Sequence, residues 1–209
     1  MSLSVWGQIF AACYDRFMAP TERAGLAGHR AALLQGASGR VLEIGGGTGA
    51  NLPYYGARVS ELVLSEPEEA MARRLERKLV RSSIPARVLR ARAEVLPVAS
   101  GTFDCVVSTL VLCTVQDPAR ALEEIRRVLT PHGRLLLIEH VRSPDPALAR
   151  WQDRLHRPWR WFGHGCNCNR RTMESLNAAG FSVAELRRDE LAKVPPLVRP
   201  LLIGAAARA

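Results

Sequence analysis

The chain has 209 residues, of which 47% are hydrophobic, so it can bury one substantial core and we expect a single domain over residues 1–209. No run of eighteen apolar residues occurs, and the first residues lack the basic segment of a signal peptide, so we expect neither a spanning helix nor secretion. The formal net charge is +9, but the basic residues are scattered, are nearly all arginine and accompany no nucleic-acid-binding motif. These features predict a cytoplasmic protein without a nucleic-acid partner.

Strands and helices are expected to alternate after a helical N-terminal segment. The first 36 residues form this segment, which we interpret as a lid over the site. Apolar runs then predict strands at 40–44, 61–65, 87–91, 103–112 and 134–140, and a helix at 118–129 with Asp117 at its start. Such alternation predicts an α/β fold with a Rossmann-like, doubly wound and mostly parallel sheet.

The segment 143–171 interrupts the alternation and holds three of the four tryptophans. We expect it to be an insertion near the acceptor site. The runs 181–186 and 201–207 suit a closing pair of strands, with an antiparallel strand at the C-terminal side of the sheet.

The sharpest motif is VLEIGGGTGAN at residues 41–51. Its glycines follow a strand, permit a tight turn and let a ligand approach backbone N–H groups at the start of a helix. Ala50 stands where the dinucleotide pattern G-x-G-x-x-G has its third glycine, and Glu43 precedes the first glycine. This pattern favours S-adenosylmethionine over a nicotinamide cofactor.

A second acidic residue supports this interpretation. Glu66 ends the second predicted strand, is followed by Pro67, and lies seventeen residues beyond Gly49. A carboxylate at that place can accept hydrogen bonds from both hydroxyls of a ribose. Together with the glycine loop, it predicts an adenosyl-cofactor site.

Three stretches of the chain resemble class I S-adenosylmethionine-dependent methyltransferases. They are VLEIGGGTGANLPYY, ARAEVLPVASGTFDCVVSTLVLCTVQD and RRVLTPHGRLLLIEHV. Within this class the chain is similar to methyltransferase type 11 domains and to ubiquinone/menaquinone-biosynthesis enzymes. It is most similar to the methyltransferase-like thiol methyltransferases, through the TLVLC run, the EHV strand end and the GCN cluster.

The resemblance implies roles for individual residues. The glycine loop would cradle the methionine part of the cofactor, Glu66 would hold the ribose, and the end of the fourth strand would border the sulfonium. The cofactor-binding residues implied in this way are Glu43, Gly45, Gly46, Gly47, Gly49, Asn51, Glu66, Pro67, Met71, Ala93, Glu94, Thr109 and Leu110.

The chain departs from its relatives at two places. The membrane-bound thiol enzymes begin with a hydrophobic anchor, whereas this chain has a short amphipathic start with Val5, Trp6, Ile9, Phe10 and Tyr14, which could cover the site or touch lipid. Peripheral contact with a membrane therefore stays open. Arg92 also occupies a position where relatives often carry an acid, beside the expected adenine.

The acceptor is expected to be a small, apolar molecule, with a thiol favoured. A thiolate needs little activation, whereas an amine, phenol or carbon acceptor would need a positioned base. His140, at the carboxyl end of the fifth strand, is the candidate catalytic residue. Methylation of a phospholipid or quinone precursor, and a cofactor-binding scaffold without turnover, are the alternatives. Candidate acceptor-binding residues are Tyr14, Cys113, Trp161 and His164.

The five cysteines are expected to be free thiols, because their number is odd and no secretory signal accompanies them. The spacing of His164, Cys166 and Cys168 lacks the second ligand pair of a structural zinc site, so no metal is expected.

Overall fold

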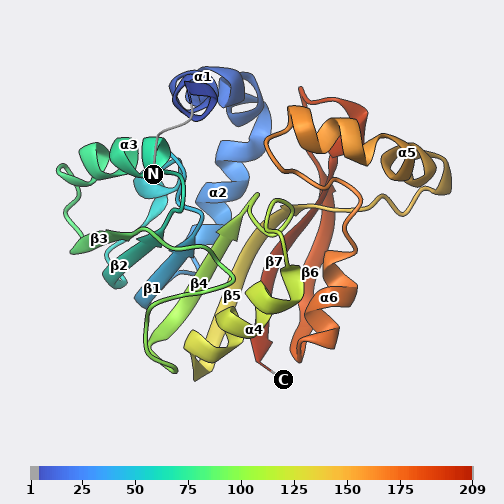
Figure 1. The fold of residues 1–209 in the computed structure, drawn as a ribbon. Coiled ribbons are helices and arrows are strands. Elements are labelled where there is room, and N and C mark those ends of the chain that lie inside the picture. Colours follow the sequence, from blue (N-terminus) through green and yellow to red (C-terminus); the bar gives the residue numbers. More distant parts are fainter. Residues whose placement is uncertain (1–4, 209) are drawn as a thin grey trace.

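The computed structural model describes residues 5–208, with side chains described from Cys13 onward. Its seven strands form one sheet in the order β3-β2-β1-β4-β5-β7-β6. The pairs from β3 to β5 are parallel, and β7 is antiparallel to both β5 and β6 (Figure 1). This confirms the predicted Rossmann-like sheet. The strands are β1 (Gly39–Ile44), β2 (Val59–Ser65), β3 (Ala86–Leu89), β4 (Phe103–Thr109), β5 (Leu129–His140), β6 (Phe181–Glu190) and β7 (Pro200–Arg208).

Helices cover both faces of the sheet. None of the described helices is long and apolar enough to cross a bilayer. The helices are α1 (Val5–Thr21), η1 (Glu22–Leu26), α2 (Ala27–Leu34), η2 (Leu52–Tyr54), α3 (Glu69–Leu79), α4 (Pro118–Val128), α5 (Pro146–Phe162), α6 (Thr172–Ala178) and η3 (Pro196–Val198).

Two apolar cores separate these helices from the sheet. On one face Leu122 and Ile125 of α4 pack with Leu176 of α6 against the strands. On the other, Leu34 of α2 and Leu75 of α3 pack with the opposite side chains of the same strands. Because each central strand is buried on both faces, its sequence is a continuous apolar run.

The fourth strand is shorter than predicted. It ends at Thr109 rather than at residue 112, because Leu110 adopts a positive φ of 59° and turns the chain. The apolar run continues beyond the turn as a buried loop, so hydrophobicity alone could not mark the end of the strand. The fifth strand is longer than predicted, because Leu129 already pairs with Phe103, ahead of the expected start at residue 134.

The described part of the first 36 residues and the segment 143–171 are mainly helical. Residues 143–171 contain α5, which is capped by Asp145, whose carboxylate accepts from the N–H groups of Ala147 and Leu148. In Figure 1, α1 and α5 both lie at the end of the molecule toward which β4 runs. That the first 36 residues act as a lid stays a prediction. The side chains of Val5, Trp6, Ile9 and Phe10 lie outside the part of the chain whose side chains are described.

Candidate active site

The glycine loop joins β1 to the segment before η2. Gly45, Gly47 and Gly49 all adopt positive φ, at 58°, 54° and 83°. A Cβ on Gly45 would lie 2.5 Å from Val111 Cγ2, whereas one on Gly47 would meet only the Gly45 carbonyl oxygen at 3.9 Å. The loop thus packs tightly at Gly45 and leaves space beside Gly47, as a cradle for a ligand requires.

Glu66 lies directly after β2 and faces this loop. Its Oε2 accepts from the Gly47 N–H at 2.8 Å, and its Oε1 accepts from the Glu68 N–H at 2.9 Å. Burial raises the pKa of Glu66, and these two backbone hydrogen bonds oppose the rise. Each oxygen keeps a further lone pair, so the carboxylate can still accept from ribose hydroxyls.

A buried network supports the loop from behind. The carboxylate of Glu43 accepts from Asn51 Nδ2 at 3.0 Å and from the Tyr55 hydroxyl at 2.7 Å. Asn51 also donates to Thr109 Oγ1 at 3.0 Å and accepts from Arg30 at 2.7 Å. Burial raises the pKa of Glu43 to about 7, against the opposing hydrogen bonds. The network joins α2, β1 and the end of β4, so Glu43 and Asn51 fix the shape of the loop.

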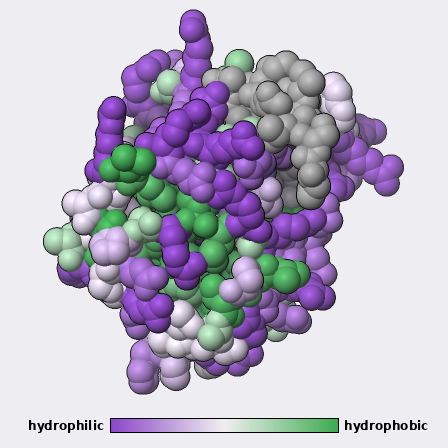
Figure 2. Space-filling model, turned by 60° about the vertical axis from the view of Figure 1, so that its left-hand side comes forward, coloured by the Kyte–Doolittle hydropathy of each residue, from purple (hydrophilic) through white to green (hydrophobic). Residues whose placement is uncertain are grey.

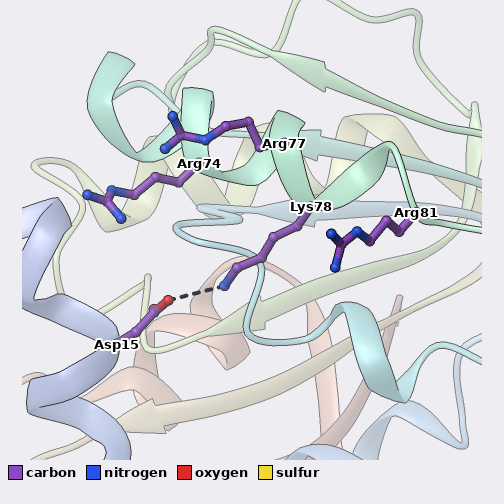
Figure 3. Close-up of a pocket in the computed structure, with 5 residues that line it drawn as sticks. All are labelled: Asp15, Arg74, Arg77, Lys78 and Arg81. Atoms are coloured by element: carbon purple, nitrogen blue, oxygen red, sulfur yellow. Dashed lines mark hydrogen bonds and ion pairs between the residues drawn. The ribbon is translucent and has the colours of Figure 1, made fainter.

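The helix α1 is tied to the same loop through Asp15. The Thr48 hydroxyl donates to Asp15 Oδ1, and Lys78 on α3 donates to Asp15 Oδ2 at 3.1 Å (Figure 3). A basic hollow of about 330 Å³ lies beside this contact, lined by Asp15, Arg74, Arg77, Lys78 and Arg81. Figure 2 shows hydrophilic residues over the upper part of the face that includes this region. Asp15 therefore links the N-terminal helix to the glycine loop and to α3.

The turn after β4 is built on Glu139. This fully buried carboxylate accepts from the Ser108 hydroxyl at 2.6 Å and from the N–H groups of Val111 and Leu112 at 3.0 and 2.9 Å. It also accepts from the Cys113 N–H at 3.1 Å. Three of its four hydrogen bonds come from backbone N–H groups, so this carboxylate holds the turn in shape. It positions Leu110 and Cys113 rather than meeting an acceptor.

The Gly-Cys-Asn loop packs against this turn. Asn167 N–H donates to the Cys113 carbonyl at 2.7 Å, and Arg170 donates to the carbonyls of Leu112, at 2.7 Å, and Val115. The thiols of Cys113 and Cys166 are hydrogen-bonded to each other, and this bond together with burial raises the pKa of Cys113 far above its ordinary value. The TLVLC and GCN motifs, distant in sequence, thus form one structural unit.

His140 ends β5 near this unit. Burial lowers its pKa to about 4, opposed by a hydrogen bond to the backbone of Val198. The buried Nδ1 has no hydrogen-bond partner among the described residues. The imidazole is therefore neutral at physiological pH, with one nitrogen left for another group. Its catalytic role stays a prediction.

Apolar residues surround the carboxyl ends of the strands here. Met18 of α1, Leu110 and Val194 pack against a cluster that includes Ile138 and Leu201. Tyr14 of α1 is half-buried, and burial raises its pKa to about 12 while the charge of Arg30 opposes the rise. The groups that act on Tyr14 electrostatically include Cys113, so two predicted acceptor-binding residues lie in one neighbourhood.

The remaining predicted cofactor-binding residues differ in burial. Met71 and Ala93 are buried and Pro67 is exposed. Glu94 accepts from Arg92 at 3.2 Å and from the Gln116 N–H at 2.8 Å, and these bonds lower its pKa despite burial. Arg92 is thereby paired. A contact of Glu94 with adenine would have to share this carboxylate.

Two acceptor-binding candidates are exposed. Trp161 is 82% exposed on α5, so its side chain faces solvent and does not form the wall of an enclosed site. His164 is exposed in the loop after α5, with a positive φ of 49°. The face of α5 that meets the protein carries Ala149 and Gln152, and a contact of Trp161 with the acceptor stays a prediction.

Sequence reasoning missed Asp15, Arg30, Tyr55, Gln152 and Arg170. Each is a polar side chain that acts across a long sequence separation. Of these, only Tyr55 lies within a motif that resembled relatives, and no periodicity marks any of them. Among the described residues, no cluster of three histidine, cysteine or acidic side chains could hold a metal.

The fold and this site define a class I S-adenosylmethionine-dependent methyltransferase. A family model described as a methyltransferase domain matches residues 42–137. The fold is similar to that of a SAM-dependent methyltransferase from Thermotoga maritima, with a TM-score of 0.72 at 23% identity over 97% of this chain and 98% of that one. The chain belongs to this class, and S-adenosylmethionine is its cofactor. The open cradle at Gly47 and the carboxylate of Glu66 fit that group.

Among its relatives is the thiol S-methyltransferase TMT1B of Homo sapiens. The two are 37% identical over 187 residues, which cover 84% of this chain and 74% of the relative. The phosphatidylethanolamine N-methyltransferase of Cereibacter sphaeroides is 32% identical over 133 residues, covering 60% of this chain and 66% of the relative.

Proposed function

We propose that the protein methylates the sulfur of a small, apolar thiol. The observation that carries this proposal is the 37% identity with a thiol S-methyltransferase over 84% of the chain. Support comes from the motifs involved, because the TLVLC turn, the EHV strand end and the GCN loop contact one another. The apolar cluster around Leu110 and Met18 favours an apolar acceptor.

The cofactor would supply a methyl group on a positively charged sulfur, which is electrophilic without further activation. The chain's own residues bind and orient. Gly47 and Glu66 would hold the adenosyl and methionine parts, and Glu43 and Asn51 keep the loop in shape. Leu110 and Met18 exclude water from the place where sulfur meets the methyl group, which favours transfer over hydrolysis.

Little base catalysis is needed for a thiol. The thiol of free cysteine has a pKa of about 8.5, so a few per cent of such a thiol is thiolate at neutral pH. His140 is neutral, and its unpartnered Nδ1 would accept a hydrogen bond from the incoming thiol and hold it in line. A pKa of about 4 makes His140 a weak base, which suits a thiol better than an amine or a carbon acid.

The proposal extends to where the protein works. The described cysteines Cys13, Cys105, Cys113, Cys166 and Cys168 are all free thiols, which supports a reducing, cytoplasmic compartment.

Release of adenosylhomocysteine tests the function. The panel holds an alkyl thiol, an aryl thiol, phosphatidylethanolamine and a quinol, each with wild type, Glu66→Gln and His140→Gln. We expect turnover with the thiols only, loss of cofactor affinity in Glu66→Gln, and a lower kcat with unchanged cofactor affinity in His140→Gln. Turnover with the lipid or quinol alone would move the acceptor to that class. Cofactor binding without turnover on any acceptor would favour a scaffold.

A further inference from the structure

The helix α5 carries an apolar stripe on the face that does not meet the rest of the protein. Trp151, Leu155, Pro158 and Phe162 follow at intervals of four, three and four residues, which places them on one side of a helix. Trp151 is 55% exposed, Leu155 37% and Phe162 65%, and Pro158 is exposed as well. Four neighbouring apolar side chains therefore face outward.

This stripe is distinct from the buried face of α5. Ala149 and Gln152 are fully buried, and Trp159 is half-buried against Cys166 and Cys168. Those residues anchor the helix to the protein. Phe162 touches the Trp159 ring, with ring centres 6.2 Å apart, but the stripe as a whole stays exposed, so burial in the fold does not explain why it is apolar.

Arginines flank the stripe along one side. Arg150, Arg154 and Arg157 are exposed and repeat at the same helical intervals, and Trp161 follows them on the same side. The guanidinium of Arg154 lies 6.0 Å from the ring centre of Trp151. A hollow of about 550 Å³ next to them is lined by Ala147, Arg150, Trp151, Asp153 and Arg154.

The acidic residues of α5 do not offset this charge. Asp153 is paired with Arg142 at 2.8 Å and accepts from Asn169 at 3.1 Å. Asp145 caps the start of the helix through the Ala147 and Leu148 N–H groups. The outward face of α5 thus combines exposed aromatic rings with uncompensated positive charge.

We propose that this face of α5 docks on the surface of a bilayer that contains anionic lipids. Tryptophan and phenylalanine insert at the boundary between headgroups and acyl chains, and arginines pair with phosphate and carboxylate headgroups. A second copy of the chain would bring identical arginines face to face, so charge complementarity favours the lipid. In Figure 1, α5 lies with α1 at the end of the molecule where the site is built, so docking would bring the site near the membrane.

Vesicle co-sedimentation of the full chain tests the proposal. Phosphatidylcholine vesicles with and without phosphatidylserine are compared at low and high salt. The variants are Trp151→Ser/Phe162→Ser, which removes two rings of the stripe, and Arg150→Glu/Arg154→Glu, which reverses the charge beside it. Val80→Ser is the matched control, because Val80 is an 85% exposed apolar side chain outside α5.

We expect wild type and Val80→Ser to bind vesicles containing phosphatidylserine, and to bind less at high salt. Both double variants should lose about tenfold in affinity. Each variant is also tested for thermal unfolding and for turnover of a soluble thiol without vesicles. A failure of membrane docking can therefore be distinguished from a failure of the proposed thiol methylation. Absence of wild-type binding, or equal binding of all variants, would overturn the proposal. A wild-type dimer that the double variants dissociate would assign the stripe to a second copy.

Discussion

The backbone N–H of Gly47 donates a hydrogen bond of 2.8 Å to Oε2 of Glu66. This bond joins the glycine loop to the end of β2 and orients the carboxylate for a ribose. Glu66→Gln retains one acceptor oxygen but loses the second, so we expect the Kd for S-adenosylmethionine to rise about tenfold. Isothermal titration calorimetry measures this, with Glu123→Gln as the control, because Glu123 is an exposed carboxylate on α4. An unchanged Kd would place the ribose elsewhere.

Gly45 and Gly56 provide a comparison of steric cost. A Cβ on Gly45 would lie 2.5 Å from Val111 in a backbone with φ of 58°, whereas Gly56 has open space around it. Gly45→Ala should lower the free energy of unfolding by about 3 kcal/mol, through backbone strain and overpacking. Gly56→Ala should be near neutral. Urea unfolding compares the two, and equal stabilities would mean that Val111 moves aside freely.

Asp15 should influence cofactor affinity although it lies on α1. Asp15→Ala removes the partners of Thr48 and Lys78 together, so we expect the cofactor Kd to rise about fivefold. Lys78→Ala removes only an exposed ion pair and should have little effect. Titration of both variants with the cofactor distinguishes the two contacts. Similar losses in both would assign the effect to the ion pair.

Glu43 should make stability depend on pH. Burial raises its pKa from 4.5 to about 7, so between these values the folded protein holds a proton that the unfolded chain has released. The stability that Glu43 contributes to the fold is therefore fully present below pH 4.5 and is lost as pH rises through 7. Glu43→Gln lacks this titration.

From acidic to alkaline pH, the free energy of unfolding of Glu43→Gln should rise relative to that of wild type by on the order of 3 kcal/mol. One pKa unit corresponds to about 1.4 kcal/mol. Urea unfolding of both proteins at about pH 5 and about pH 8 gives this difference. A difference that stays constant with pH would show that Glu43 remains ionised in the fold.

Glu139 should be needed for the shape of the turn after β4. Glu139→Gln places an amide near the Cys113 N–H, where a carboxylate oxygen now accepts at 3.1 Å. We expect a loss of about 2 kcal/mol in the free energy of unfolding, since a buried donor loses its acceptor. Ser108→Ala removes a single donor to Glu139 and should cost less. The reverse order of stabilities would contradict the assignment of Glu139 as the anchor of the turn.

The sequence predicted the sheet well because its signals are local. Apolar runs, the glycines at 45, 47 and 49 and Asp117 before Pro118 all act over a few residues. The end of β4 was not predictable in this way. The turn at Leu110 is held by the hydrogen bond between Val111 and Glu139, which are 28 residues apart. The contact between Cys113 and Cys166 was not predictable for the same reason, because the fold brings them together and their spacing in the sequence does not indicate it.

The site was predictable only in part. Gly47 and Glu66 have roles that residue type and strand position define. Asp15 and Arg30 carry no such signal in the sequence, because a carboxylate or guanidinium on an N-terminal helix is usually solvated. Only the position of the helix in the fold brings these side chains to the loop. Trp161 has an exposure that residue type did not predict, because its position on α5 turns the side chain outward.

Gln152 connects α5 to three other segments. Its amide nitrogen lies within hydrogen-bond distance of the carbonyl oxygens of Val141, Cys168 and Leu197, which share its two N–H donors, and its Oε1 accepts from the Ser143 N–H at 2.8 Å. These bonds tie α5 to the residues after β5, to the Gly-Cys-Asn loop and to η3. A protein that rests on a surface through α5 would hold one fixed angle to it, and the direction from which an acceptor arrives would be set by how this single amide is bonded.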